Sequence, residues 1–136
     1  MARAVVVGAT VGIVIGAFLP WIISGQRTRN SFTTVQLARA LGVVEHETVL
    51  VMMAGWYFVP LGVVMVVVLA ALDHQRSCAV MAAAIGAVAV AFALIVRFSP
   101  VATDVGVAVT LGAGVLTVVA SVILFGGAVS PVEPRD

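Results

Sequence analysis

Charged residues are absent from four long stretches of this chain, and this absence limits the possible folds more than any other feature. The uncharged stretches cover about residues 4–24, 48–72, 78–96 and 105–127. A helix needs about 20 apolar residues to cross the roughly 30 Å hydrocarbon core of a bilayer. Each stretch is therefore expected to form a transmembrane helix. The runs are continuous rather than alternating in hydropathy, which argues against a transmembrane barrel.

The overall composition agrees with this interpretation. Of the 136 residues, 62% are hydrophobic and 10% are charged, and the mean hydropathy is +1.24. Soluble domains carry about 25% charged residues, so this chain has too few charges to cover a surface exposed to water. The formal net charge of +1 leaves no basic patch for nucleic acid. We therefore predict an all-α integral membrane protein of four transmembrane helices, with membrane lipids around them.

Two polar regions lie outside the predicted membrane helices. Residues 128–136 carry two prolines and three charges and are predicted to be disordered. The loop of residues 25–47 contains the segment SFTTVQLARALG, which predicts a short interfacial helix capped by Asn30 or Ser31. The apolar residues of this helix share one side at 100° per residue: Val35, Leu37, Ala38 and Leu41. A packed loop and a recognition element both fit this pattern.

The second uncharged stretch contains a proline. Pro60 lacks a backbone N–H and its ring clashes with the preceding turn, so we expect a kink near residues 56–60. A straight helix over residues 48–72 would be about 37 Å long, which exceeds the hydrocarbon thickness. Its first turns are therefore expected in the headgroup zone, with Trp56 at the interface. The proline is interpreted as a tolerated kink, and a gating hinge is the alternative.

Small residues recur at a spacing of four in three of the predicted helices. Membrane helices associate by close packing of small residues, because lipid tails are as apolar as leucine. We expect these residues to form helix-packing faces, within the chain or against a partner: Gly8, Gly12, Gly16, Ala83, Gly86, Ala87, Gly106 and Gly114. The same pattern also arises by chance in sequences rich in alanine and glycine.

Residues for catalysis or metal binding are not apparent in the sequence. A charge deep within a membrane helix would mark an ion or proton path, and none is present. The segment HETVL at His46 resembles the zinc motif HExxH, but Leu50 occupies the second histidine position. Cys78 is the single cysteine, and neither it nor any serine has an obvious base nearby. We expect no enzymatic activity, no metal and no cofactor.

The loop after the first helix carries the charges that a partner could contact. We interpret five residues as candidate contacts to lipid headgroups or to an acidic partner surface: Arg27, Arg29, Arg39, Trp21 and Trp56. The alternative is that the arginines only flank the membrane.

The pattern LPWxxSGxRTRNSF, ending at Phe32, is followed by LARALG and later by WxxxP. Over roughly the first 60 residues this sequence resembles uncharacterised small four-helix membrane proteins of actinobacteria. The resemblance implies cytoplasmic termini and an outward-facing loop, and it supplies no activity. Arginine counts, three on the terminal side and four on the loop side, favour the opposite orientation slightly. We take the termini to be cytoplasmic, in a bacterial inner membrane crossed several times.

Two functions remain compatible with the sequence. The leading hypothesis is a non-enzymatic accessory or assembly subunit of a larger bacterial membrane complex, bound to a membrane-protein partner or to further copies of itself. The competing hypothesis is a small oligomeric transporter or channel, in which the kinked second helix lines the path.

Overall fold

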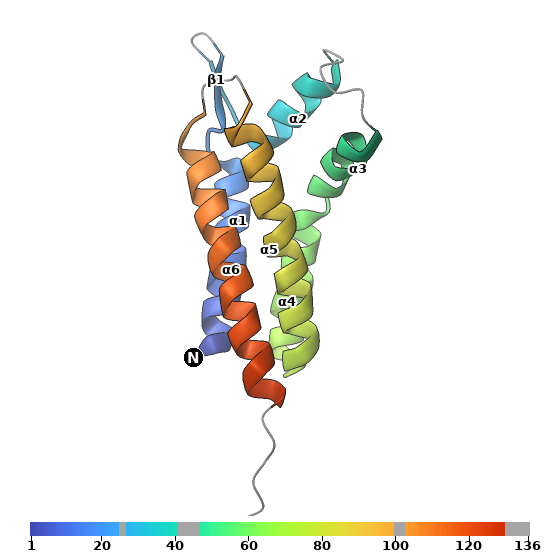
Figure 1. Cartoon of the computed structure of the whole chain (residues 1–136), viewed down its shortest axis with the longest axis vertical. Coiled ribbons are helices and arrows are strands. Elements are labelled where there is room, and N and C mark those ends of the chain that lie inside the picture. The colour runs from blue at the N-terminus through green and yellow to red at the C-terminus, as the bar shows by residue number, and fades with distance from the viewer. Residues whose placement is uncertain (25–26, 41–46, 100–102, 130–136) are drawn as a thin grey trace, which may run out of the picture.

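The computed structural model describes residues 1–24, 27–40, 47–99 and 103–129, and most of these residues are helical. Four helices lie side by side along the long axis of the molecule, as Figure 1 shows. They are α1 (Ala2–Phe18), α4 (Val59–Ala71), α5 (Gln75–Arg97) and α6 (Val105–Val129). The remaining elements gather at one end of this bundle: β1 (Ile22–Ser24), β2 (Arg27–Arg29), α2 (Ser31–Ala40) and α3 (Glu47–Trp56).

The two ends of the bundle differ. We call the end with the hairpin, α2 and α3 the loop end, and the opposite end the terminal end. The chain begins at the terminal end, and α6 finishes there (Figure 1). The turn from α4 to α5 is also at the terminal end, whereas the connection from α5 to α6 is at the loop end.

Among the described residues, two helices are long and apolar enough to cross a membrane. These are the 23-residue segments Gln75–Arg97 and Val105–Gly127, with mean hydropathies of 2.7 and 2.4. The prediction of four such helices is therefore wrong. Helix α1 has only 17 residues, and the second uncharged stretch is divided between α3, of 10 residues, and α4, of 13.

Prolines account for both differences. Leu19 has extended backbone angles, φ −68° and ψ 163°, and it precedes Pro20, which disfavours a helical conformation in the residue before it. At the second site, Phe58 N–H bonds to the Gly55 carbonyl at 2.9 Å in a turn, and Pro60 lies in the first turn of α4. Proline is well tolerated there, because the first N–H groups of a helix have no partner within it. The region of the predicted kink is thus a break between two helices.

The β-hairpin was not predicted, because we expected no strands. Strands β1 and β2 pair antiparallel, with Ile22 opposite Arg29 and Ser24 opposite Arg27. Ile22 also forms an isolated bridge to Thr103, which precedes α6. Each strand has three residues, too few to produce a recognisable alternation in the sequence.

Candidate functional site

Trp21 and Trp56 lie inside the loop end rather than at its surface. Both side chains are 0% exposed, so the prediction that they contact lipid headgroups or a partner is wrong. The Trp56 ring stacks on Phe92 of α5, with centroids 4.6 Å apart and ring planes at 19°. Trp21 contacts Trp56 edge to face, with centroids 5.5 Å apart. The three rings form an aromatic cluster that joins the loop end to the bundle.

Hydrogen bonds hold this aromatic cluster to the end of α1. The Trp21 indole N–H donates to the Gly16 carbonyl at 2.8 Å, and the Ser31 hydroxyl donates to the Ala17 carbonyl at 2.7 Å. Both side chains thus bond to carbonyls in the last turn of α1, where the Gly16 carbonyl also accepts a hydrogen bond from Leu19 N–H at 3.2 Å. The Trp56 indole N–H donates to the Ser31 hydroxyl at 3.0 Å. Ser31 therefore links α1, α2 and α3 through one buried atom.

The start of α6 is tied to the same region. Asp104 N–H donates to the Trp21 carbonyl at 2.8 Å, and Gly106 N–H donates to the Pro20 carbonyl at 2.7 Å. A Cβ atom on Gly106 would lie 2.5 Å from the Pro20 carbonyl oxygen and 2.5 Å from Cδ1 of Trp21. Gly106 therefore permits close contact with the loop end, whereas we expected it to pack against another membrane helix.

The predicted short helix and one of its candidate caps are present. Helix α2 begins at Ser31, and the Asn30 side-chain oxygen accepts a hydrogen bond from Thr33 N–H at 3.0 Å. Val35 is fully buried, as its position on the apolar side indicated. Leu41 and Gly42 lie outside the described residues, as do the side chains of Leu37 and Ala38.

Of the three candidate contact arginines, the structure describes the side chain of Arg29 alone. Arg29 is half-buried in β2, and its Nε atom has no hydrogen-bond partner among the described residues. The side chains of Arg27 and Arg39 lie outside the description. Arg27 begins β2, so it belongs to the same hairpin as Arg29.

The small residues of α1 contact α6 over part of their length. A Cβ atom on Gly16 would lie 2.9 Å from the backbone nitrogen of Thr110, and one on Gly12 would lie 3.3 Å from Cβ of Ala113. A Cβ atom on Gly8 would meet nothing within 4 Å. The glycine spacing therefore corresponds to close packing at two positions and to open space at the third.

Helices α5 and α6 also meet through glycines. A Cβ atom on Gly86 would lie 2.9 Å from the Gly114 carbonyl oxygen, and one on Gly114 would lie 2.9 Å from Cγ2 of Val90. Ala83 is half-buried, whereas Ala87 is exposed. Ala87 therefore does not contribute to packing within the chain.

An apolar groove runs along the outside of the bundle between α4 and α5. Its larger part has a volume of about 470 Å³ and is lined by apolar side chains and glycines, among them Phe58, just before α4, and Met65 within α4. A second part of about 410 Å³ continues from it, because Met81 and Ala84 line both. Arg76 lines this second part, toward the terminal end. We call this feature the α4–α5 groove; the sequence pattern gave no sign of it.

The described residues contain no group of three or more His, Cys, Asp or Glu side chains able to hold a metal ion. His46, which begins the HETVL segment, lies outside the described residues. No protein-family model matches the sequence, and no curated protein or solved structure matches it either.

Proposed function

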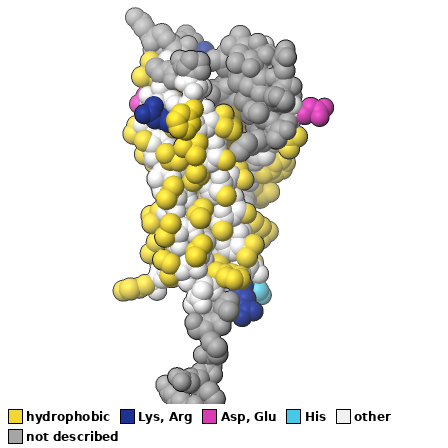
Figure 2. Space-filling view, viewed as in Figure 1, with side chains coloured by type: hydrophobic (Ala, Val, Ile, Leu, Met, Phe, Trp, Pro, Cys, Tyr) yellow, Lys and Arg dark blue, Asp and Glu magenta, His cyan; other side chains and the backbone are white. Residues whose placement is uncertain are grey.

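We propose that this protein is a non-enzymatic accessory or assembly subunit of a larger bacterial membrane complex. The distribution of side chains supports a membrane location. Exposed large apolar residues occur on α1, α4, α5 and α6, and Figure 2 shows hydrophobic side chains along the side of the bundle with charged ones toward its ends. Contiguous apolar surface of this kind marks a membrane or protein interface. In this proposal α5 and α6 cross the membrane and α1 and α4 lie beside them.

The main support for an assembly role is the buried, hydrogen-bonded packing of the loop end. Trp21, Ser31 and Trp56 are each fully buried, and their hydrogen bonds add to the ring contacts that join these elements. A buried and satisfied polar network of this kind rigidifies its surroundings. A rigid surface binds a partner at a lower entropic cost than a flexible loop does.

The hairpin provides the chemistry for such a partner. Arg27 and Arg29 begin and end β2, and Arg29 is only half-buried, so part of its side chain remains accessible. Arginine forms strong, directional hydrogen bonds with carboxylates. We infer that a membrane-protein partner contributes acidic residues at this position.

Affinity purification from native membranes in a mild detergent tests this proposal, with copurifying proteins identified by mass spectrometry. We expect one membrane protein to copurify with the unmodified chain and to be lost from the double variant Arg27→Gln, Arg29→Gln. Arg97→Gln is the matched control, because Arg97 is an exposed arginine at the same end of the bundle. A homogeneous monomer with no copurifying protein would contradict the proposal.

Transport is placed second, because the cavity beside the break between α3 and α4 is apolar. The cavity beside Pro60 is lined by valines of α1 and α4: Val11, Val14, Val63, Val64, Val67 and Val68. Two buried hydroxyls, on Thr110 and Ser121, lack partners among the described residues, and neither residue lines this cavity. Ion flux through liposomes that changes with Thr110→Val would favour transport over assembly.

A further inference from the structure

Three aromatic rings form a patch at the surface of the loop end, in addition to the buried aromatic cluster. Phe18 ends α1, Phe32 lies in the first turn of α2, and Tyr57 directly follows α3. The Phe32 ring contacts the other two, with centroids 5.2 Å from Phe18 and 5.6 Å from Tyr57. Phe18 is 61% exposed and Tyr57 is 40% exposed, whereas Phe32 is half-buried. We call these three residues the aromatic patch.

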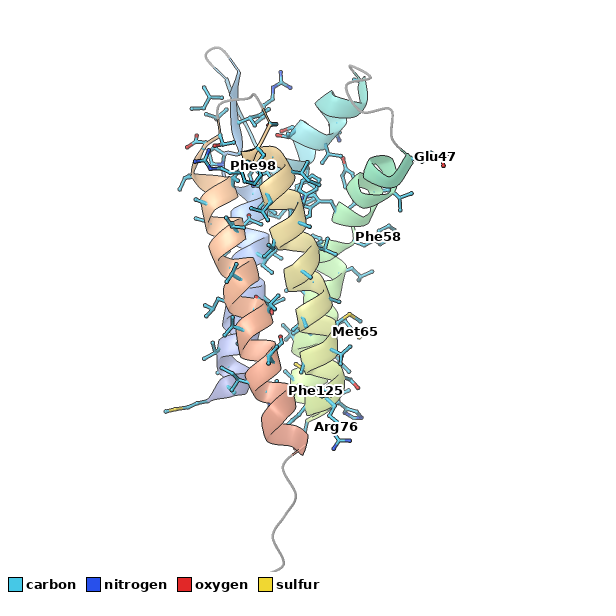
Figure 3. The ribbon with its side chains drawn as sticks, in the orientation of Figure 1. Glu47, Phe58, Met65, Arg76, Phe98 and Phe125 are labelled. Carbon is cyan, nitrogen blue, oxygen red and sulfur yellow. The ribbon has the colours of Figure 1, made fainter. Side chains whose placement is uncertain are left out.

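The surface on one side of the aromatic patch is apolar. Ile15 is exposed and shares a face of α1 with Phe18, because residues three apart in a helix lie on the same side. Phe58 and Leu61 are exposed at the start of α4. Figure 3 shows Phe58 on the outside of the molecule, where α3 meets α4. This apolar surface continues from the patch along the uncharged helices of the bundle.

The surface on the other side of the aromatic patch is polar. Gln36 lies one turn after Phe32 on α2 and is exposed, as is Thr33. The Asn30 side-chain oxygen accepts hydrogen bonds from Thr33, so polar groups surround the start of α2. The Tyr57 hydroxyl points toward this helix, since it donates to the Phe32 carbonyl at 3.4 Å. The patch therefore separates an apolar helix surface from a polar one.

We propose that the aromatic patch anchors the loop end at the boundary between the hydrocarbon and the headgroups of a lipid bilayer. Ile15 and Leu61 then lie in the hydrocarbon, and α2 lies on the membrane surface. Aromatic side chains with an apolar ring and a polar tip are enriched at this boundary, because each part meets the solvent that suits it. Tyr57 takes the interfacial position that the sequence suggested for Trp56. The inference rests on the membrane location in the proposed function, but it does not depend on a protein partner.

Quenching of tryptophan fluorescence in lipid vesicles tests the anchor. The purified full chain is reconstituted with phosphatidylcholine that carries bromine either near the headgroup or near the methyl end of its acyl chains, and iodide is the quencher in water. Phe18→Trp and Tyr57→Trp each place a reporter in the aromatic patch. The unmodified protein gives the background from Trp21 and Trp56, which are buried. We expect both reporters to be quenched more by the shallow bromine than by the deep bromine, and only weakly by iodide.

Two exposed positions at other depths provide matched controls, Leu116→Trp and Thr28→Trp. Leu116 lies about 16 Å along α6 from Val105, close to half of the roughly 30 Å hydrocarbon thickness, so its reporter should respond most to the deep bromine. The reporter in β2, at Thr28, should respond to iodide and not to bromine. Thermal unfolding in detergent checks that each variant folds, and Phe18→Trp is sufficient for the test if Tyr57→Trp does not fold.

The outcomes separate this inference from the proposed function. Quenching of the patch reporters by iodide alone would place the patch in water and overturn the anchor, whereas bromine quenching of Leu116→Trp would leave the membrane location and the assembly role intact. Patch reporters shielded from bromine and iodide alike would show that a second copy of the chain covers the patch, which also overturns the anchor. Stronger quenching by the deep bromine would place the loop end inside the hydrocarbon and contradict it too. If bromine does not quench Leu116→Trp, both proposals are overturned.

Discussion

The indole N–H of Trp56 donates a hydrogen bond to the Ser31 hydroxyl at 3.0 Å, and that hydroxyl donates in turn to the Ala17 carbonyl at 2.7 Å. Both hydrogen bonds are shielded from solvent, because Ser31 and Trp56 are 0% exposed. These two hydrogen bonds connect the end of α1 to the end of α3, and so they help to position α3 against the bundle.

We expect Ser31→Ala to destabilise the protein by about 1–3 kcal/mol, because it leaves the Trp56 indole N–H buried without an acceptor. The measurement is reversible unfolding in mixed detergent micelles. Gln36→Ala is the matched control, since Gln36 is an exposed polar residue of the same helix, and it should change stability by less than about 0.5 kcal/mol.

A double-mutant cycle between Ser31→Ala and Trp56→Phe sharpens this prediction. The two changes should be less damaging together than the sum of their separate effects, because the double variant leaves no unpaired indole N–H. Strict additivity would show that the hydrogen bond contributes nothing to stability.

Alanine substitutions at two glycines of α1 should have different effects on the free energy of unfolding. Gly16→Ala is expected to cost about 1–3 kcal/mol, because its new methyl group would meet the backbone of Thr110, which cannot move without shifting α6. Gly8→Ala should be neutral or stabilising by up to about 1 kcal/mol, since a Cβ there meets nothing within 4 Å and alanine favours the helix. The same micelle unfolding measurement compares them. A Gly8→Ala variant as unstable as Gly16→Ala would mean that the open part of this face contacts another chain.

Replacing Asp73 by asparagine and by alanine should lower the stability of the protein by different amounts. It is the one non-glycine residue with positive φ in the described chain, at 60°, and its side chain pairs with Arg3. Its N–H and that of His74 bond back to Ala70 and Leu69, in the arrangement that commonly ends a helix. Asn tolerates this backbone conformation whereas Ala does not.

We therefore expect Asp73→Asn to lower stability by less than about 1 kcal/mol, with an effect that shrinks at high salt, because the ion pair is solvent-accessible. Asp73→Ala should cost about 1 kcal/mol more than Asp73→Asn, from backbone strain that salt does not screen. Thermal unfolding at two salt concentrations separates the two contributions. Equal losses in both variants would show that the backbone conformation is not strained.

Labelling of introduced cysteines tests the proposed orientation. Thr28 in β2 and Ser77 in α5 are both exposed and lie at opposite ends of the bundle. In a Cys78→Ala background, a membrane-impermeant maleimide should label Thr28→Cys in intact cells and Ser77→Cys only after permeabilisation. Cys78 itself is 0% exposed and should remain unlabelled in the folded, unmodified protein. The reverse pattern would place the termini outside, and labelling of both positions in intact cells would contradict a membrane-crossing bundle.

The sequence predicted those helices whose formation depends on residues within the helix itself. The uncharged stretches correctly indicated apolar helices at residues 78–96 and 105–127, close to α5 and α6. The SFTTVQLARALG segment indicated α2, because its cap and its apolar spacing lie within the helix itself. Pro60 indicated the site at which the second stretch divides, but hydropathy could not show that the division is complete.

The candidate sites depended on contacts between distant residues, and the sequence predicted them less well. A tryptophan near a membrane boundary has the same local pattern whether it faces lipid or the protein interior. Trp21 and Trp56 are buried because Phe92, 36 or more residues farther along the chain, provides a surface for their rings. The α4–α5 groove likewise requires two helices to approach side by side, and no single segment encodes it.

Composition and the spacing of charges by themselves determined that this chain forms apolar helices with polar ends, because the transfer of apolar side chains out of water depends on residue type alone. The tertiary structure decided which glycines are in contact, which tryptophans are buried and where the groove opens. Those outcomes depend on how closely neighbouring helices approach, and that distance is set by side chains from both helices together.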